Sequence, residues 1–276
     1  MSRLVWLAAG LMLCTACGGS SVEQQGARVR TIGELTETAK ARLATQRIFF
    51  GHQSVGGNIM DGVGDLVREQ PTLGLRVLGL DGVRSIEGGF FAHAKVGQNE
   101  HPATKTDEFA KLLADGLASR VDIAFHKYCY VDFGQSTDVA AVFDHYRNTM
   151  ARLRESFPTV TFVHVTVPLT AVQSSPIAVI KGLLGRIPAG YEDNFHREQF
   201  NERLRREYSG REPVFDLASV ESTTVLGRKQ TAYFKGVGGP ALLAVYTSDD
   251  GHLNEVGRRR VAEELVVLLA ELPMSR

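Results

Sequence analysis

The sequence has few cysteines, no excess of charge of either sign and only a short apolar run at its N-terminus. Its 276 residues include three cysteines, and 31 lysines and arginines balance 31 aspartates and glutamates. Because the charges balance and no long run of one sign is present, nucleic acid is not expected as a partner. The apolar run, residues 4–13, is shorter than the roughly 20 residues that a transmembrane helix needs.

The N-terminus has the pattern of an export signal. The apolar run follows a positive residue, and small residues precede Cys17. This arrangement resembles a bacterial lipobox, which implies removal of residues 1–16 and lipid on Cys17; simple secretion is the alternative. Residues 17–30 are small and polar, as a flexible tether would be. We therefore expect an exported protein, held by lipid at the periplasmic face or surface of a bacterial envelope, with residues 31–276 as one domain.

Helix and strand patterns alternate through that domain, which favours a parallel sheet between helices. Strands are predicted at residues 47–50, 75–80, 121–130, 159–167 and 214–217. Helices are predicted at residues 32–44, around 59–67, and at 106–118, 139–157, 194–208 and 255–272. The glycine-rich stretch 81–104 is predicted to be a loop, and 159–167 a fully buried central strand. Residues 170–193 are interpreted as a packed helix in preference to a lid.

A glycine-rich turn joins the first strand to the helix that follows it. The turn, residues 51–57, contains Ser54 and points the helix N-terminus at whatever lies beside it. Such a turn exposes a serine as a nucleophile, although on its own it more often only changes the direction of the chain.

A second polar segment precedes the last helix. A serine hydroxyl becomes nucleophilic when an imidazole accepts its proton, and a carboxylate holds that imidazole in the required tautomer. Asp249 and His252 are close enough in sequence for one turn to hold both. The alternative is that Asp249 or Asp250 only caps the helix and His252 is exposed.

Together the two segments resemble the SGNH or GDSL hydrolase family, in which a serine follows the first strand and an Asp-x-x-His pair precedes the last helix. The matching residues are Ser54, Asp249 and His252. The resemblance covers nearly the whole mature chain. It implies an α/β fold, namely a three-layer α/β/α sandwich of flavodoxin-like type with a mainly parallel five-stranded sheet. It also implies a serine esterase that needs no cofactor.

Two motifs of the family are altered. The usual Gly-Asp-Ser is His52-Gln53-Ser54, and residues 127–132, which stand at the third motif, lack the asparagine that stabilises the oxyanion. We expect Asn99 to replace that asparagine, and Gly97 or Gly89 to be the oxyanion glycine. The residues expected beside the pocket are His52, Gln53, Lys127 and Asp250.

Other sites are less favoured. The eight histidines show no helical zinc spacing, although a metal site of His52, His126 and His252 is an alternative. Cys129 is interpreted as a buried core residue in preference to a thiol nucleophile, and His164 as a core histidine.

The sequence therefore predicts an esterase that hydrolyses acetyl or similar esters, with cell-envelope or extracellular carbohydrate as a reasonable substrate. The alternative is a non-catalytic lipoprotein that keeps the fold and binds carbohydrate or another envelope component. Serine-dependent chemistry distinguishes the two.

Overall fold

The chain is built around a parallel β-sheet. The structure, a computed structural model, describes residues 30–172, 190–234 and 237–273. Five strands pair in the order β2-β3-β1-β4-β5, and every pairing is parallel. Their bounds are β1 Arg47–His52, β2 Val77–Gly79, β3 Phe90–Lys95, β4 Ile123–His126 and β5 Thr161–Phe162. The predicted α/β fold with a parallel sheet is confirmed.

The predicted fourth strand is buried but is not central in the five-stranded sheet, where β5 is the end strand. Directly after β5, strand β6 (His164–Val165) pairs in parallel with β7 (Val214–Phe215). The continuous run of β5 and β6 is therefore flanked by β4 on one side and by β7 on the other. Val163, between the two short strands, is fully buried.

The prediction of a loop over residues 81–104 is wrong. Strand β3 lies within that stretch and pairs with β1 from Arg47–Phe90 to His52–Lys95. Glycines before and after it conceal its short apolar run, and Phe90 and Phe91 pack on opposite faces of the sheet. Tertiary pairing therefore prevails over the local turn signal.

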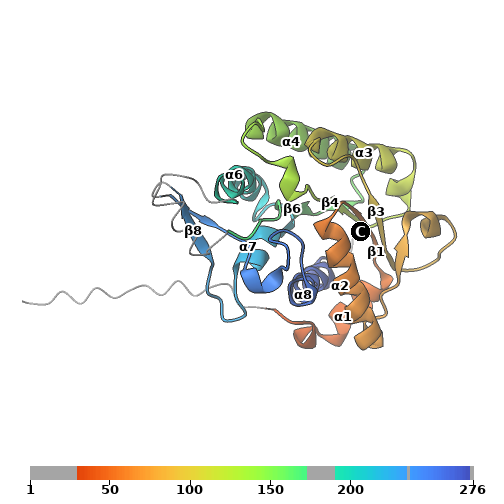
Figure 1. Cartoon of the computed structure of the whole chain (residues 1–276). Helices are drawn as coiled ribbons and strands as arrows, with labels where there is room; N and C mark the ends of the chain where they lie inside the picture. The colour runs from red at the N-terminus through yellow and green to blue at the C-terminus, as the bar shows by residue number, and fades with distance from the viewer. Residues whose placement is uncertain (1–29, 173–189, 235–236, 274–276) are drawn as a thin grey trace, which may run out of the picture.

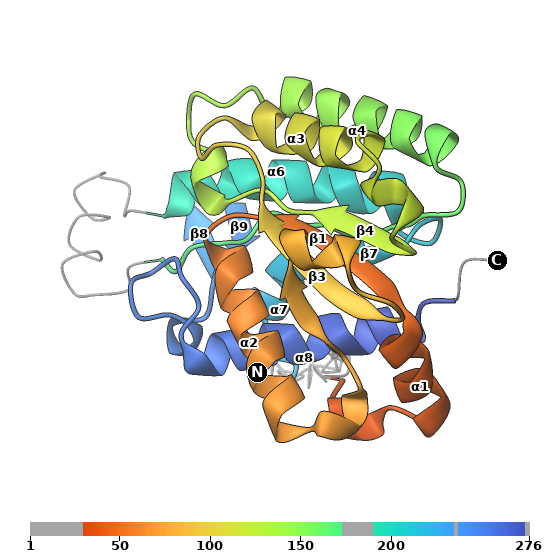
Figure 2. The same cartoon turned by 90° about the vertical axis from the view of Figure 1, so that its right-hand side faces the viewer.

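Helices cover both faces of the sheet (Figures 1 and 2). On one face lie α1 Glu37–Thr45, α2 Val55–Glu69 and α8 Glu255–Glu271; on the other lie α3 Pro102–Ala114, α4 Val139–Ser156 and α6 Tyr191–Tyr208. Side chains alternate along β1, so Ile48 and Phe50 join the core beneath α2 and α8 whereas Phe49 joins the core beneath α3 and α4. These two cores make the three-layer sandwich.

Shorter elements complete the described part of the chain. They are α7 Leu217–Ser222, the antiparallel hairpin β8 Thr231–Phe234 and β9 Val237–Pro240, and the 3-10 helices η1 Ile32–Glu34, η2 Pro71–Leu73, η3 Leu80–Arg84, η4 Leu117–Ser119, η5 Tyr130–Asp132 and η6 Ala244–Tyr246. Within the described ranges, no helix has the length and hydropathy required to cross a bilayer. The predicted leader, the predicted tether up to residue 29 and most of residues 170–193 lie outside those ranges.

Candidate active site

The carboxyl end of β1 is the centre of the candidate site. β3 and β4 flank β1 in parallel, so the loops that follow all three strands meet at the same edge. After β1 the chain turns at Gln53 and Ser54 into α2, with Ser54 at the N-cap. Residues 96–101 follow β3 and residues 127–134 follow β4.

Ser54 has a strained backbone. Its φ of 45° and ψ of −111° fall outside the helical and extended regions that most residues adopt. Strain of this kind is frequent where a strand-to-helix turn presents a nucleophile. The turn also needs Gly56, because a Cβ there would lie 2.3 Å from the Cβ of His52.

Helix packing brings the two ends of the sequence together. α8 packs against α2 at Gly62, where a Cβ would lie only 2.5 Å from the carbonyl oxygen of Arg258. The Leu253 N–H donates to Asn58 Oδ1 of α2 over 3.3 Å. The segment before α8 is thereby fixed beside the N-terminus of α2, where Ser54 lies.

Ser54, His252 and Asp249 form a hydrogen-bonded chain. Ser54 Oγ lies 2.6 Å from His252 Nε2, and His252 Nδ1 lies 2.7 Å from Asp249 Oδ2. The His252 side chain is 44% exposed, so the imidazole can be reached from solvent. The order of groups is that of a nucleophile, a base and a residue that orients the base.

The carboxylate of Asp249 is held by its own loop. The backbone N–H groups of His252 and Gly251 donate to Asp249 Oδ1 over 2.7 and 3.1 Å. The bond from the His252 N–H, with the imidazole beside it, lowers the pKa of Asp249 to about 2. Asn254, not Asp249 or Asp250, caps α8 by accepting from the Gly257 N–H over 3.0 Å. The capping interpretation of the two aspartates is therefore wrong.

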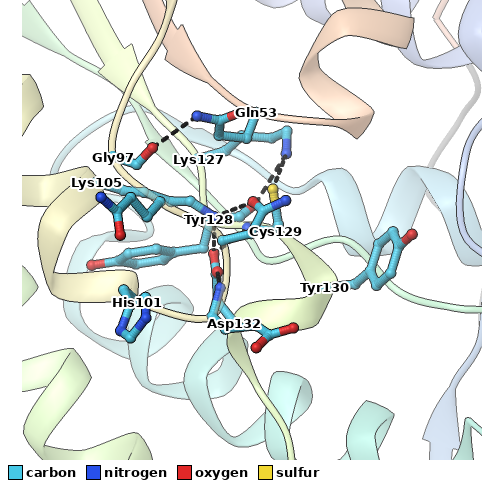
Figure 3. Close-up of polar contacts among 12 residues, drawn as sticks. Gln53, Gly97, His101, Lys105, Lys127, Tyr128, Cys129, Tyr130 and Asp132 are labelled. Atoms are coloured by element: carbon cyan, nitrogen blue, oxygen red, sulfur yellow. Dashed lines mark hydrogen bonds and ion pairs between the residues drawn. The ribbon is translucent and has the colours of Figure 1, made fainter.

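Gln53 ties the serine turn to the neighbouring loop (Figure 3). Its Nε2 donates to the carbonyl oxygens of Gly97 at 2.8 Å and Val96 at 3.3 Å. His52 does not face the pocket, since it is buried with its Nε2 2.9 Å from His93 Nδ1, and burial lowers its pKa to about 3. Gln53, and not His52, therefore tethers the serine turn to the loop after β3.

The two predicted oxyanion glycines differ in position and in hydrogen bonding. Gly89 precedes β3 and so lies at the amino end of the sheet, and its carbonyl oxygen accepts from Arg76. The Gly97 N–H donates to Glu108 Oε2 over 2.6 Å, which removes it as an oxyanion donor. Both assignments are corrected by these positions.

Asn99 lies in the loop that follows β3. The backbone N–H groups of its neighbours Gln98 and Glu100 donate to Thr104 Oγ1 and Asp132 Oδ1. Its side-chain oxygen accepts from Lys105 Nζ over 3.0 Å, and the residue is exposed.

Lys127 does not reach the pocket. Its side chain is fully buried, and its Nζ donates to the Tyr128 carbonyl oxygen over 3.1 Å and lies 3.8 Å from Cys129 Sγ (Figure 3). Burial lowers the pKa of Lys127. Cys129 is also fully buried, which fits the core interpretation.

Sequence reasoning missed a buried ion pair between Lys105 and Asp132. The two side chains are 0% exposed and approach within 2.5 Å. Lys105 lies in α3, where a lysine is usually solvated, so nothing in the sequence distinguishes it from a surface residue.

The three histidines of the metal alternative do not converge. His126 is buried beside Thr106, His52 bonds to His93, and His252 bonds to Ser54 and Asp249. Among the described residues, no group of three His, Cys, Asp or Glu side chains is placed to hold a metal ion. His164 is buried against Tyr146, as a core histidine would be.

A cavity of about 410 Å³ is lined in part by Asp249. Its lining also includes Asp250, Gly251, Tyr130 and Arg197. The Tyr130 ring meets the His252 ring edge-on at 5.7 Å, and Arg197 Nε donates to the Tyr130 carbonyl oxygen over 2.9 Å. Of the residues expected beside the pocket, Asp250 lines this cavity.

Comparison with known proteins was made by sequence and by structure. No family model and no curated protein matches the sequence. Solved structures at low sequence identity include SGNH/GDSL hydrolase-family proteins. One, from Desulfitobacterium hafniense and assigned to the G-D-S-L family of lipolytic proteins, shares 10% identity over 81% of this chain and 99% of its own, with a TM-score of 0.44. One from Parabacteroides merdae, described as a GDSL-like lipase, shares 12% identity over 82% of this chain and 96% of its own, with a TM-score of 0.45. A peptidoglycan O-acetylesterase shares 14% identity over 65% of this chain and 45% of its own, with a TM-score of 0.39.

Proposed function

We propose that the protein is a serine esterase of the SGNH/GDSL type with Ser54 as its nucleophile. The observation that supports this is the hydrogen-bonded chain from Ser54 Oγ through His252 to Asp249, with distances of 2.6 and 2.7 Å. The strained backbone of Ser54 supports the same role, because a serine that only caps a helix does not require a φ of 45°.

The reaction follows from the positions of these atoms. Ser54 Oγ attacks the acyl carbonyl carbon while His252 Nε2 accepts the hydroxyl proton. The bond to Asp249 Oδ2 keeps the other proton on His252 Nδ1 and stabilises the imidazolium. His252 then returns its proton to the leaving alcohol oxygen. Water, deprotonated by the same imidazole, releases the acid and regenerates Ser54.

The oxyanion needs hydrogen-bond donors beside Ser54. The backbone N–H of Ser54 lies at the N-terminus of α2, where the helix dipole favours negative charge. Asn99 supplies the second donor in this proposal, because it is exposed and the N–H groups on either side of it are engaged.

Small acetyl esters on a polar, hydroxyl-rich alcohol are the proposed substrates. The cavity beside Asp249 offers Thr170, Asp193 and the ring of Tyr130, groups that suit a carbohydrate. A lipid anchor on Cys17, which we also propose, would place this cavity beside polysaccharide of the cell envelope.

Labelling with a fluorophosphonate probe tests the nucleophile. We expect the purified protein to be labelled and to hydrolyse 4-nitrophenyl acetate, and Ser54→Ala to abolish both. His252→Ala should lower kcat by at least about 10⁴-fold, and Asp249→Asn by about 10²–10⁴-fold.

The chain offers a matched control for each change. Ser85→Ala removes another exposed serine, and His145→Ala breaks a second His–Asp pair, the 2.8 Å contact between His145 and Asp107 on the far helical layer. Both controls should keep wild-type activity. Wild-type protein without labelling or turnover would refute the esterase and favour the binding module.

A further inference from the structure

A buried ion pair joins the start of α3 to the segment that follows β4. Lys105 belongs to the first turns of α3, and Asp132 ends the 3-10 helix η5 after β4. Their side chains are fully buried, and Lys105 Nζ lies 2.5 Å from Asp132 Oδ2. Because β3 and β4 flank β1, the pair connects two loops across the end of the strand that leads to Ser54 (Figure 3).

Asp132 binds the backbone of both loops. Its Oδ1 accepts from the Glu100 N–H over 2.8 Å, and its Oδ2 accepts from the Cys129 N–H over 2.6 Å. One carboxylate therefore fixes the path of residues 96–101 relative to residues 127–134.

Lys105 also fixes the side chain of Asn99. Its Nζ donates to Asn99 Oδ1 over 3.0 Å. A carboxamide has one oxygen and one NH₂ group, so an ammonium bound to the oxygen sets the plane of the amide and leaves the NH₂ group as its free donor. The exposed position of Asn99 makes that donor accessible to a bound substrate.

Stability gives little reason for this pair. Burial of two opposite charges costs about as much as their attraction returns, and apolar replacements of both partners are often neutral or stabilising. The benefit is geometric, because an oxyanion donor is effective only when it is fixed before the charge develops.

We propose that Lys105 and Asp132 are positioning residues that hold Asn99 as the oxyanion donor of Ser54. Asn99 then replaces the asparagine that is missing from residues 127–132, and Asp132 of that segment contributes through Lys105. The inference rests on the proposed esterase activity. Neither Lys105 nor Asp132 contacts the substrate.

A double-mutant cycle tests the coupling, with kcat and KM for 4-nitrophenyl acetate as the readout. Asn99→Ala should lower kcat about 10²-fold with little change in KM, because the donor acts on the transition state. Lys105→Met should lower kcat about 10-fold or more. The combined variant should have nearly the same kcat as Asn99→Ala alone, because the donor that Lys105 positions is already absent.

Two further variants separate positioning from folding. Lys105→Met leaves Asp132 buried without its partner, so it is compared with Lys105→Met combined with Asp132→Asn, which removes both charges. Asn99→Asp keeps an oxygen for Lys105 but removes the NH₂ donor, so it should fold as wild type and lose kcat as Asn99→Ala does. Circular dichroism and thermal unfolding establish that each variant is folded.

Three results would overturn the inference. In the first, Asn99→Ala lowers kcat by the same factor in the wild type and in Lys105→Met. The second is a folded charge-free variant with wild-type kcat, and the third is an Asn99→Asp variant with wild-type kcat. Each refutes the positioning role while the wild type remains active, whereas an inactive and unlabelled wild type refutes the esterase itself.

Discussion

Gln53→Glu changes one atom of the tether between the serine turn and the loop after β3. Gln53 Nε2 donates to two carbonyl oxygens, 2.8 Å from Gly97 and 3.3 Å from Val96. The substitution keeps the size of the side chain but places a carboxylate oxygen against both carbonyls. Each lost hydrogen bond costs about 0.5–1.5 kcal/mol, and the repulsion adds to this, so the total is about 2–4 kcal/mol.

That free energy is divided between folding and catalysis. Expressed wholly in folding, it lowers the unfolding temperature by about 5–15 °C in a protein of this size. Expressed as displacement of the Ser54 turn, it lowers kcat by about 10–10³-fold. Both are measured, by circular dichroism and by hydrolysis of 4-nitrophenyl acetate between pH 5 and 8. The losses should be smaller at acid pH, where the introduced carboxyl group is protonated and donates again.

Gln98→Glu is the matched control, since it adds the same charge to an exposed side chain of the same loop. It should leave the unfolding temperature and kcat within error of wild type. If Gln53→Glu also did so, the tether would have no role in holding Ser54.

Three other predictions concern separate parts of the chain. In Gly251→Ala, the new Cβ would lie 2.8 Å from the Tyr130 ring, so the ring should shift and change KM severalfold with little loss of stability; an unchanged KM would separate Tyr130 from substrate binding. Burial raises the pKa of Glu221 from 4.5 to about 8, so stability falls as pH rises through that interval. Between pH 5 and 9, Glu221→Gln should therefore reduce the decrease in the free energy of unfolding by up to about 5 kcal/mol, as measured by urea unfolding. Parallel pH profiles of wild type and variant would contradict this. Mass spectrometry of membrane-extracted protein should find a lipid-modified N-terminus at Cys17, and an unmodified N-terminus elsewhere would exclude the anchor.

Periodicity in the sequence was sufficient for most of the fold. The helices at α2, α4 and α8 and the strand at β1 follow from apolar spacing, because each element buries one face or is wholly buried. Strand β3 did not follow, because glycines surround its short apolar run and only pairing with β1 makes it a strand.

The sequence by itself determined the types of residue at the candidate site and their order along the chain. Ser54, Asp249 and His252 were recognisable because their order along the chain resembles that of the SGNH or GDSL hydrolase family. Their 2.6 and 2.7 Å contacts depend on the packing of α8 against α2, which no local pattern encodes.

The tertiary structure was needed to find the groups around Ser54. Gly97 donates its N–H to Glu108, and Gly89 lies at the other end of the sheet, so neither matches its predicted role. Gln53 tethers the serine turn through Gly97. These contacts form only when segments distant in the sequence pack together. The ion pair of Lys105 and Asp132 was likewise visible only in the folded chain. Two charged residues 27 positions apart in the sequence give no sign that both are buried.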